Sequence, residues 1–297
     1  MSKQQTTRSH TIPQMYLKNF ANKKGQVWTY SLKDHRYFKQ NIKDACVKNK
    51  TYEFTKNKVD NILENNLAEK EAIWGPLLYN IINGKTKLTR KEIEDLLRFC
   101  FIQFFRTSQG RKQLVNILRN NKRYKNIKKI IPANCEIENF VLSHTIDLVD
   151  KIIAGDIVTE IKIYKTKNEI YISDTPIIIN ESFSAIYCPL TSNSYIVLKL
   201  ISKTTILHYQ NPITIQLIKS YDYNFLDFNI SCFDYKYLDN LNYDFSNFNN
   251  LILMFSVVQG CEQIFKCSKF NNYELFLFKD LPPMFYFYLL KEDNNEL

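Results

Sequence analysis

The stretch that most constrains the fold is residues 96–105, LLRFCFIQFF, which is apolar on almost every side of a helix. Thr89, followed three residues later by Glu92, matches the capping box that begins many helices, so we expect a helix over residues 89–121. A helix that is apolar all round is normally surrounded by protein. The sequence therefore predicts a central buried helix.

Two polar side chains, Gln103 and Arg106, lie in or just after this apolar stretch and three residues apart, hence on nearly one face. A buried amide and guanidinium require partners. With Arg111 they would suit recognition of a phosphate or carboxylate. The alternative is a buried arginine paired with a carboxylate such as Asp174 or Glu71, which would fix the fold.

The remaining periodicity predicts an α+β fold. Helices are expected over 59–83, 136–154, from Asn211-Pro212 onward, and over 247–268. Strands are expected at 26–31, 36–43, 157–164, 169–173, 176–180, 185–190, 194–200, 204–208 and 273–278. Pro76 predicts a kink or two helices within 59–83. We expect one compact unit, 1–297, in which a basic, mainly helical half (1–130) with a short N-terminal hairpin packs on a mostly antiparallel sheet with further helices (131–297).

Composition excludes several classes of protein. The chain of 297 residues is 45% hydrophobic and 14% aromatic, which excludes global disorder. Its most apolar run, 251–258, is about half as long as a membrane-spanning helix requires. The N-terminal sequence MSKQQTTRSH has no apolar secretion segment, and the seven cysteines form no CxxC pair. We therefore expect a cytoplasmic protein with reduced cysteines and no membrane partner.

Charge is unevenly distributed along the chain. Residues 1–129 carry 28 Lys and Arg against 10 Asp and Glu, a net charge of +18, whereas residues 130–297 carry 12 against 20, a net charge of −8. Residues 122–129 form a basic connector. This asymmetry indicates a polyanionic partner such as nucleic acid. The alternative is that an AT-rich genome enriches lysine and that the lysines only coat a solvated surface.

Two segments carry polar side chains suited to chemistry. His10 precedes Pro13, which presets a short helix, so the imidazole could turn into a cleft and act as acid, base or metal ligand. It could equally cap or brace that helix. Asp174 lies at a predicted strand end, where a carboxylate can bind a divalent ion or orient an imidazole. Ordinary turn chemistry in Ser173-Asp174-Thr175 explains it equally well.

A third segment is acidic. Glu64 and Glu71 are seven residues apart on one helix face and could supply metal ligands, although a solvated face is the simpler explanation.

The order and spacing of these motifs resemble the bacterial domain of unknown function 4238 family from about residue 9 to about residue 268. The resemblance rests on His10, Pro13, Tyr16, Leu17, Phe20, Trp28, Tyr30, Tyr52, Glu53, Leu67, Glu71, Gln103, Arg106, Thr107, Ser173, Asp174, Pro176, Pro189 and Leu190. The family turn usually carries Asn between Asp and Pro, where this chain has Thr175. The resemblance implies a polar signature similar to that of an enzyme and carries no established activity.

One hypothesis is a phosphodiester hydrolase resembling a nuclease. His10 would be the general acid or base, Arg106 would stabilise phosphate charge, and Gln103 would position substrate or water. Asp174, with Glu71, would hold Mg²⁺ or Mn²⁺ or orient His10. Substrate would be bound by Tyr16, Arg111 and Ser173.

The other hypothesis is a non-enzymatic module that binds nucleic acid or protein and whose polar signature is structural. Burial distinguishes the two, because a catalytic group must line an open pocket. A role in bacterial defence or as a toxin is compatible with the hydrolase.

Overall fold

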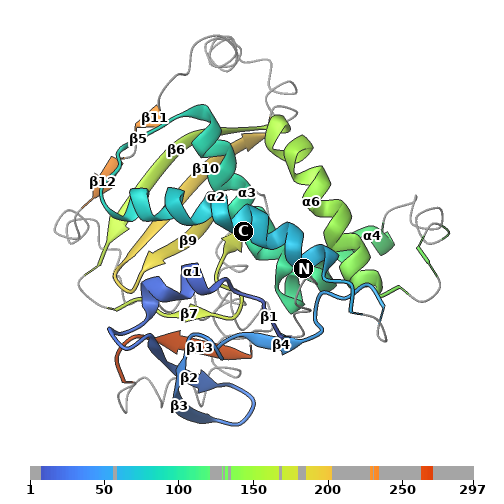
Figure 1. Cartoon of the computed structure of the whole chain (residues 1–297). Coiled ribbons are helices and arrows are strands. Elements are labelled where there is room, and N and C mark those ends of the chain that lie inside the picture. Colours follow the sequence, from blue (N-terminus) through green and yellow to red (C-terminus); the bar gives the residue numbers. More distant parts are fainter. Residues whose placement is uncertain are drawn as a thin grey trace, which may run out of the picture.

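A computed structural model describes residues 8–55, 59–120, 129, 131–132, 135–166, 169–179, 185–202, 228–229, 231–233 and 262–269. The described part is an α+β fold in which helices lie across one large, mostly antiparallel sheet and a smaller sheet lies beside it (Figure 1). The predicted strands 204–208 and 273–278, the helix from Asn211-Pro212, the connector 122–128 and most of 247–268 lie outside the described residues.

The large sheet has the strand order β12-β6-β10-β9-β8. Its strands are β6 (Asp156–Lys165), β8 (Ile178–Ile179), β9 (Ala185–Thr191), β10 (Ser194–Ser202) and β12 (Ser231–Phe233). Neighbours pair antiparallel except β12 and β6, which are parallel. The expected, mostly antiparallel sheet is thus confirmed.

The smaller sheet has the order β3-β2-β13-β7 and is antiparallel throughout. The predicted hairpin is present as β2 (Gln26–Ser31) and β3 (Arg36–Asn41). It is extended by β13 (Gln263–Lys266) and β7 (Ile172–Ser173). The helix predicted over 247–268 is therefore wrong for its described end, because the backbone of β13 pairs with that of β2.

Two short ribbons complete the strands. β1 (Arg8–His10) pairs with β4 (Val47–Asn49), and β5 (Lys87–Leu88) pairs with β11 (Phe228–Asn229). The first ribbon places the N-terminal motif beside the central helices.

The helices of the described part are α1 (Gln14–Leu17), the 3-10 turn η1 (Lys18–Phe20), α2 (Ile62–Ile82), α3 (Arg90–Arg106), α4 (Ser108–Asn120) and α6 (Ile137–Gly155). Helix α2 continues through Pro76, so a division into two helices does not occur. Pro76 lies on the exposed side of α2, while Trp74, Leu77 and Leu78 keep the buried side continuous. The predicted capping box between Thr89 and Glu92 is present at the start of α3.

The predicted single helix over 89–121 is wrong at Thr107, where the backbone is extended and α3 gives way to α4. The Thr107 hydroxyl donates to the carbonyl of Phe104 and accepts from the amide of Gly110. A Cβ on Gly110 would lie 2.1 Å from the Phe104 oxygen. Only glycine therefore fits where α4 folds back onto the end of α3.

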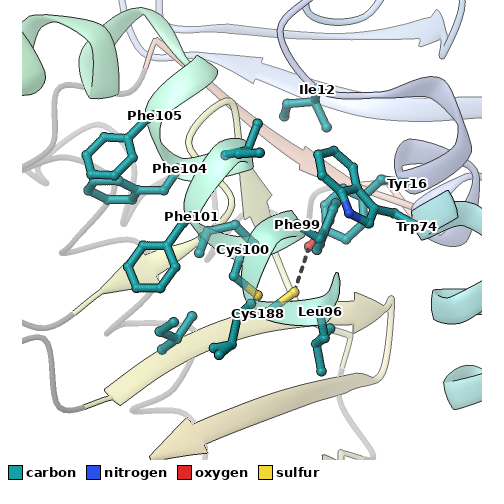
Figure 2. Close-up of a cluster of buried hydrophobic side chains, with 14 of the residues drawn as sticks. Ile12, Tyr16, Trp74, Leu96, Phe99, Cys100, Phe101, Phe104, Phe105 and Cys188 are labelled. Atoms are coloured by element: carbon teal, nitrogen blue, oxygen red, sulfur yellow. Dashed lines mark hydrogen bonds between the residues drawn. The ribbon is translucent and has the colours of Figure 1, made fainter. Parts of the chain in front are cut away.

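The core forms around the predicted central helix α3 (Figure 2). Phe99 contacts Tyr16 of α1 and Trp74 of α2, with ring centroids 5.3 and 5.7 Å apart. The neighbouring Cys100 lies near Cys188 of β9 (Figure 2). Helix α3 thus joins the N-terminal segment and α2 to the large sheet.

Candidate functional site

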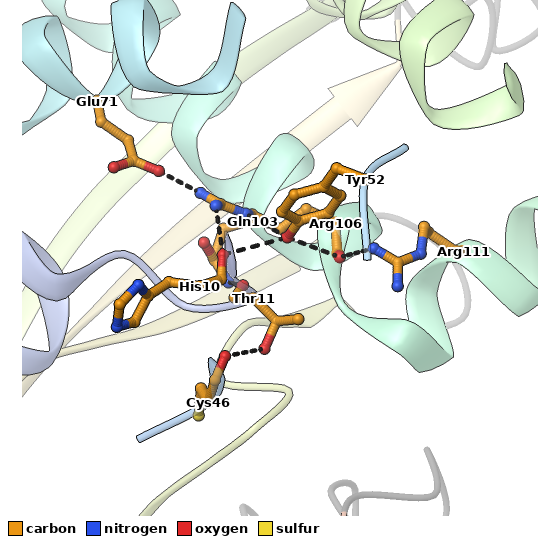
Figure 3. A network of polar contacts seen from close by, with 8 residues as sticks. All are labelled: His10, Thr11, Cys46, Tyr52, Glu71, Gln103, Arg106 and Arg111. Carbon is orange, nitrogen blue, oxygen red and sulfur yellow. Dashed lines mark hydrogen bonds and ion pairs between the residues drawn. The ribbon is translucent and has the colours of Figure 1, made fainter. Parts of the chain in front are cut away.

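Arg106, at the C-terminal end of α3, is the centre of a buried polar network (Figure 3). Its Nη1 donates to the Glu71 carboxylate of α2 at 2.6 Å, and its Nη2 donates to the His10 carbonyl at 2.7 Å. Its Nε donates to the Tyr52 hydroxyl at 3.2 Å. Every guanidinium nitrogen therefore binds a protein group, and the residue is 1% exposed.

This environment keeps Arg106 charged. Burial alone would lower the pKa of Arg106, but Tyr52 and the Glu71 carboxylate outweigh burial and raise it. The carboxylate partner is Glu71, which was one of the two considered from the sequence, and not Asp174. Breaking such a pair would leave a buried charge without compensation.

Gln103 and Arg111 extend the network along the backbone. Gln103 Nε2 donates to the carbonyl of Thr11 at 3.0 Å. Arg111 of α4 donates to the Arg106 carbonyl at 2.9 Å, and its other Nη donates to the Thr51 hydroxyl. These side chains hold the N-terminal segment and the corner between α3 and α4 in place.

Tyr52 is the member of this network that received no role from the sequence. Its hydroxyl donates to the His10 carbonyl at 3.2 Å, and its ring lies 5.6 Å from the Arg106 guanidinium carbon and 5.2 Å from that of Arg111. The signal available in the sequence was the Tyr52-Glu53 pair within the family resemblance. The Glu53 carboxylate accepts from the amides of Asp60 and Asn61, just before α2 begins.

The imidazole of His10 turns away from Arg106, although the His10 carbonyl binds it (Figure 3). Burial lowers the pKa of His10, and backbone contacts with Ile42 and Lys43 oppose that shift. Its Nε2 is buried and has no hydrogen-bond partner. Gln103 Oε1 and Arg111 Nε are likewise buried without a hydrogen-bond partner, although Arg111 Nε lies 3.8 Å from the Glu138 carboxylate.

Glu64 has similar features on the same face of α2 as Glu71. One of its carboxylate oxygens, Oε2, is buried without a partner. Burial raises the pKa of Glu64, and the Arg106 charge and a bond with Ser9 oppose that shift. The structure therefore places Glu64, His10 and Glu71 around Arg106.

Asp174 lies in a different environment. Its carboxylate accepts from the amides of Glu262, at 3.0 and 3.2 Å, and Gln263, at 3.4 Å, which fixes the start of β13. Burial raises the pKa of Asp174 to about 6, and these two amides oppose the shift. Within the part of the chain described, no hydrogen bond or ion pair connects Asp174 with His10 or Arg106.

Ser173 and Tyr16 also make internal contacts. The Ser173 hydroxyl donates to the Thr175 carbonyl and accepts from the Thr175 amide, which is the turn chemistry considered from the sequence. The Tyr16 hydroxyl donates to the Pro189 carbonyl at 2.5 Å, and the side chain is fully buried. Burial raises the pKa of Tyr16 well above its usual value.

The structure thus unites His10, Gln103, Arg106, Arg111 and Glu71, and it joins Asp174 to β13 instead. In the ranges the structure describes, no group of three or more His, Cys, Asp or Glu side chains is arranged to hold a metal ion. In the same ranges, no helix is long and apolar enough to cross a membrane.

Comparison with known proteins gives one match. The model of the family described as "Protein of unknown function (DUF4238)" matches residues 8–269. No curated protein and no solved structure matches the chain.

Proposed function

Since the chain belongs to the DUF4238 family, whose description names no function, we propose from its geometry that it is a nucleic-acid-binding protein whose polar signature is structural. The observation that carries the proposal is the charge of residues 18–43, which we call the hairpin segment. It has one acidic residue and seven basic ones, and all seven are exposed: Lys18, Lys23, Lys24, Lys33, Arg36, Lys39 and Lys43.

These charges are available to a partner. Among the described residues, Arg36 is the one of the seven that forms an ion pair, at 3.7 Å from Asp34. Arg36 and Lys39 lie in β3, and the other five lie in the segments beside and between β2 and β3. Such a group of exposed cations provides the electrostatic footprint that a phosphate backbone requires.

The Arg106 network supports the structural explanation of the signature. A phosphate could reach the Arg106 guanidinium only if the bonds to Glu71, His10 and Tyr52 were broken. Arg106 and Gln103 bind backbone carbonyls of the N-terminal segment, which leads directly into the hairpin segment. They therefore position the basic surface without contacting the nucleic acid.

The test is the salt dependence of binding. Labelled RNA and DNA are titrated with the full chain, and with a variant carrying Gln at Lys23, Lys24, Lys33 and Lys43. Each lost phosphate contact is expected to reduce the slope of log K against log salt by about 0.7 to 0.9. A control carries Gln at four exposed lysines outside the hairpin segment, Lys50, Lys87, Lys91 and Lys112, and has the same net charge. Equal slopes for all three proteins, or no binding, would contradict the proposal.

A phosphodiester hydrolase is the second candidate, favoured by the buried and unpartnered Nε2 of His10, whose imidazole interacts electrostatically with Glu71. Labelled RNA and DNA are incubated with the wild type and Mg²⁺ or Mn²⁺, beside His10→Asn and Asp174→Asn variants. Cleavage by the wild type that His10→Asn loses would favour the enzyme. Binding without cleavage would favour the non-enzymatic module.

A further inference from the structure

The smaller sheet carries aromatic and basic side chains together on one face. Trp28 of β2 and Lys39 of β3 are cross-strand partners, and Tyr37 lies two residues from Lys39, hence on the same face. Lys269 follows β13, the neighbouring strand on the other side of β2. We call Trp28, Tyr37, Lys39 and Lys269 the Trp28 face.

The four side chains of the Trp28 face are in contact. The Trp28 and Tyr37 ring centroids are 5.9 Å apart. Lys39 Nζ lies 5.5 Å from the Trp28 ring, and Lys269 Nζ lies 6.0 Å from Trp28 and 5.8 Å from Tyr37. No ion pair between described residues includes either lysine, and both ammonium groups lie over ring faces.

We propose that the Trp28 face binds single-stranded nucleic acid, with unpaired bases stacked on Trp28 and Tyr37 and backbone phosphates held by Lys39 and Lys269. Flat rings flanked by cations are the arrangement that binds single strands without sequence preference, because every base offers a π-face. A duplex conceals those faces between its stacked base pairs. The inference rests on the proposed function and adds the strandedness of the ligand and the residues that recognise it.

An anionic membrane surface would match the same charges less well. Membrane-surface elements bury aliphatic and aromatic side chains together in the acyl boundary. Among the described residues, Tyr37, at 38% exposure, is the one large hydrophobic side chain of this sheet that is exposed. A face with so little apolar surface favours stacking over insertion.

The chain contains its own reporter for the test. It has two tryptophans, and Trp74 is 2% exposed. A base that stacks on the surface would therefore quench the fluorescence of Trp28 and leave that of Trp74 unchanged. The full chain is titrated with oligothymidylate of about 20 nucleotides, the corresponding duplex, and vesicles containing phosphatidylserine, with anisotropy and indole emission as readouts. We expect the single strand to bind more tightly than the duplex and to quench the indole.

Variants then assign the contact. Trp28→Ala is expected to weaken single-strand binding by about fivefold to a hundredfold, and Trp28→Phe by much less, because a ring is retained. The control is Tyr79→Ala, which removes a 67% exposed ring from α2 and should leave affinity unchanged. Thermal melting checks each variant, and Tyr37→Ala replaces Trp28→Ala if that variant does not fold.

The outcomes separate the two proposals. Equal binding of single strand and duplex, with Trp28→Ala or its replacement like the wild type, overturns the Trp28 face and leaves nucleic-acid binding intact. Binding to vesicles alone, or no binding at all, overturns both. Loss of affinity in Trp28→Ala or its replacement but not in Tyr79→Ala supports the inference.

Discussion

At the scale of single residues, Arg106 shows how a polar signature serves the fold. Its three nitrogens join α2, the N-terminal segment and the loop carrying Tyr52, all from one buried position. The side chains that the sequence marks as suited to chemistry instead form hydrogen bonds with backbone carbonyls and with one another. Four buried atoms of these side chains have no hydrogen-bond partner: His10 Nε2, Glu64 Oε2, Gln103 Oε1 and Arg111 Nε.

Replacing Arg106 should therefore be severely destabilising. Arg106→Met leaves the Glu71 carboxylate and the His10 carbonyl without their cationic donor, so we expect unfolding to require about 3–5 kcal/mol less free energy. Chemical denaturation measures the loss. Glu71→Gln should cost less, because the glutamine side-chain oxygen can still accept from Nη1 and the bonds of Arg106 to His10 and Tyr52 remain. Glu69→Gln, an exposed change on the same helix, serves as control, and a similar loss there would contradict the explanation.

Tyr16→Phe tests a second buried contact. The Tyr16 hydroxyl is a buried donor to the Pro189 carbonyl of β9. Removal of this hydroxyl leaves that carbonyl with the weak thiol donor of Cys188, at 3.5 Å, and we expect a loss of about 1–2 kcal/mol in unfolding free energy. If Tyr16 instead binds substrate and contributes nothing to the fold, the stability of Tyr16→Phe will equal that of the wild type.

At the scale of elements, the local pattern predicts what is local. Short-range sequence patterns predict four features: the capping box, the apolar run of α3, the β2–β3 hairpin and the long strands of the large sheet. The break at Thr107 does not, because the apolar pattern continues into α4 and the corner depends on a close backbone approach at Gly110. The sequence signal available was Thr107 three residues before Gly110.

Two glycine substitutions test that corner. Gly110→Ala would bring a methyl group against the Phe104 carbonyl, which cannot shift without moving α3, so we expect a loss of about 2–4 kcal/mol. Gly75 lies within α2, and the methyl group of Gly75→Ala would lie 4.0 Å from Met15 of α1, an ordinary contact. Because alanine favours a helix more than glycine does, this change should stabilise the protein by up to about 1 kcal/mol. A lower melting temperature for Gly110→Ala and a higher one for Gly75→Ala would support the close backbone approach at Gly110. Equal changes in the two variants would contradict it.

At the scale of the whole molecule, the hairpin segment depends on distant parts of the chain. Gln263 of β13 pairs with Ser31 of β2, over 200 residues earlier. No local pattern reports such pairing, because an apolar run of this length is compatible with both helix and strand. For the same reason the meeting of Arg106 with Glu71, and not with Asp174, was an open choice until the fold was known.

The Asp174 carboxylate accepts hydrogen bonds from the Glu262 and Gln263 amides at the start of β13, the strand that pairs with β2. Its ionisation should therefore make the stability of the protein depend on pH. Its pKa is raised from 3.8 to about 6 in the folded state, so the folded protein binds the proton more tightly than the unfolded chain. The stability from this proton is fully present below pH 3.8 and is lost as the pH rises through about 6. The loss amounts to about 2–3 kcal/mol.

Asp174→Asn removes this titration and keeps an oxygen that can accept from the Glu262 amide. We therefore expect the wild type to lose unfolding free energy relative to Asp174→Asn between about pH 4 and about pH 7. Denaturation curves for both proteins across that range give the difference, and Asp44→Asn, which removes an exposed carboxylate, corrects for the general effect of lost charge. A difference that stays constant with pH would mean that the Asp174 carboxyl is hydrated in the folded protein, and that the amides of β13 hold it as an ordinary ionised aspartate.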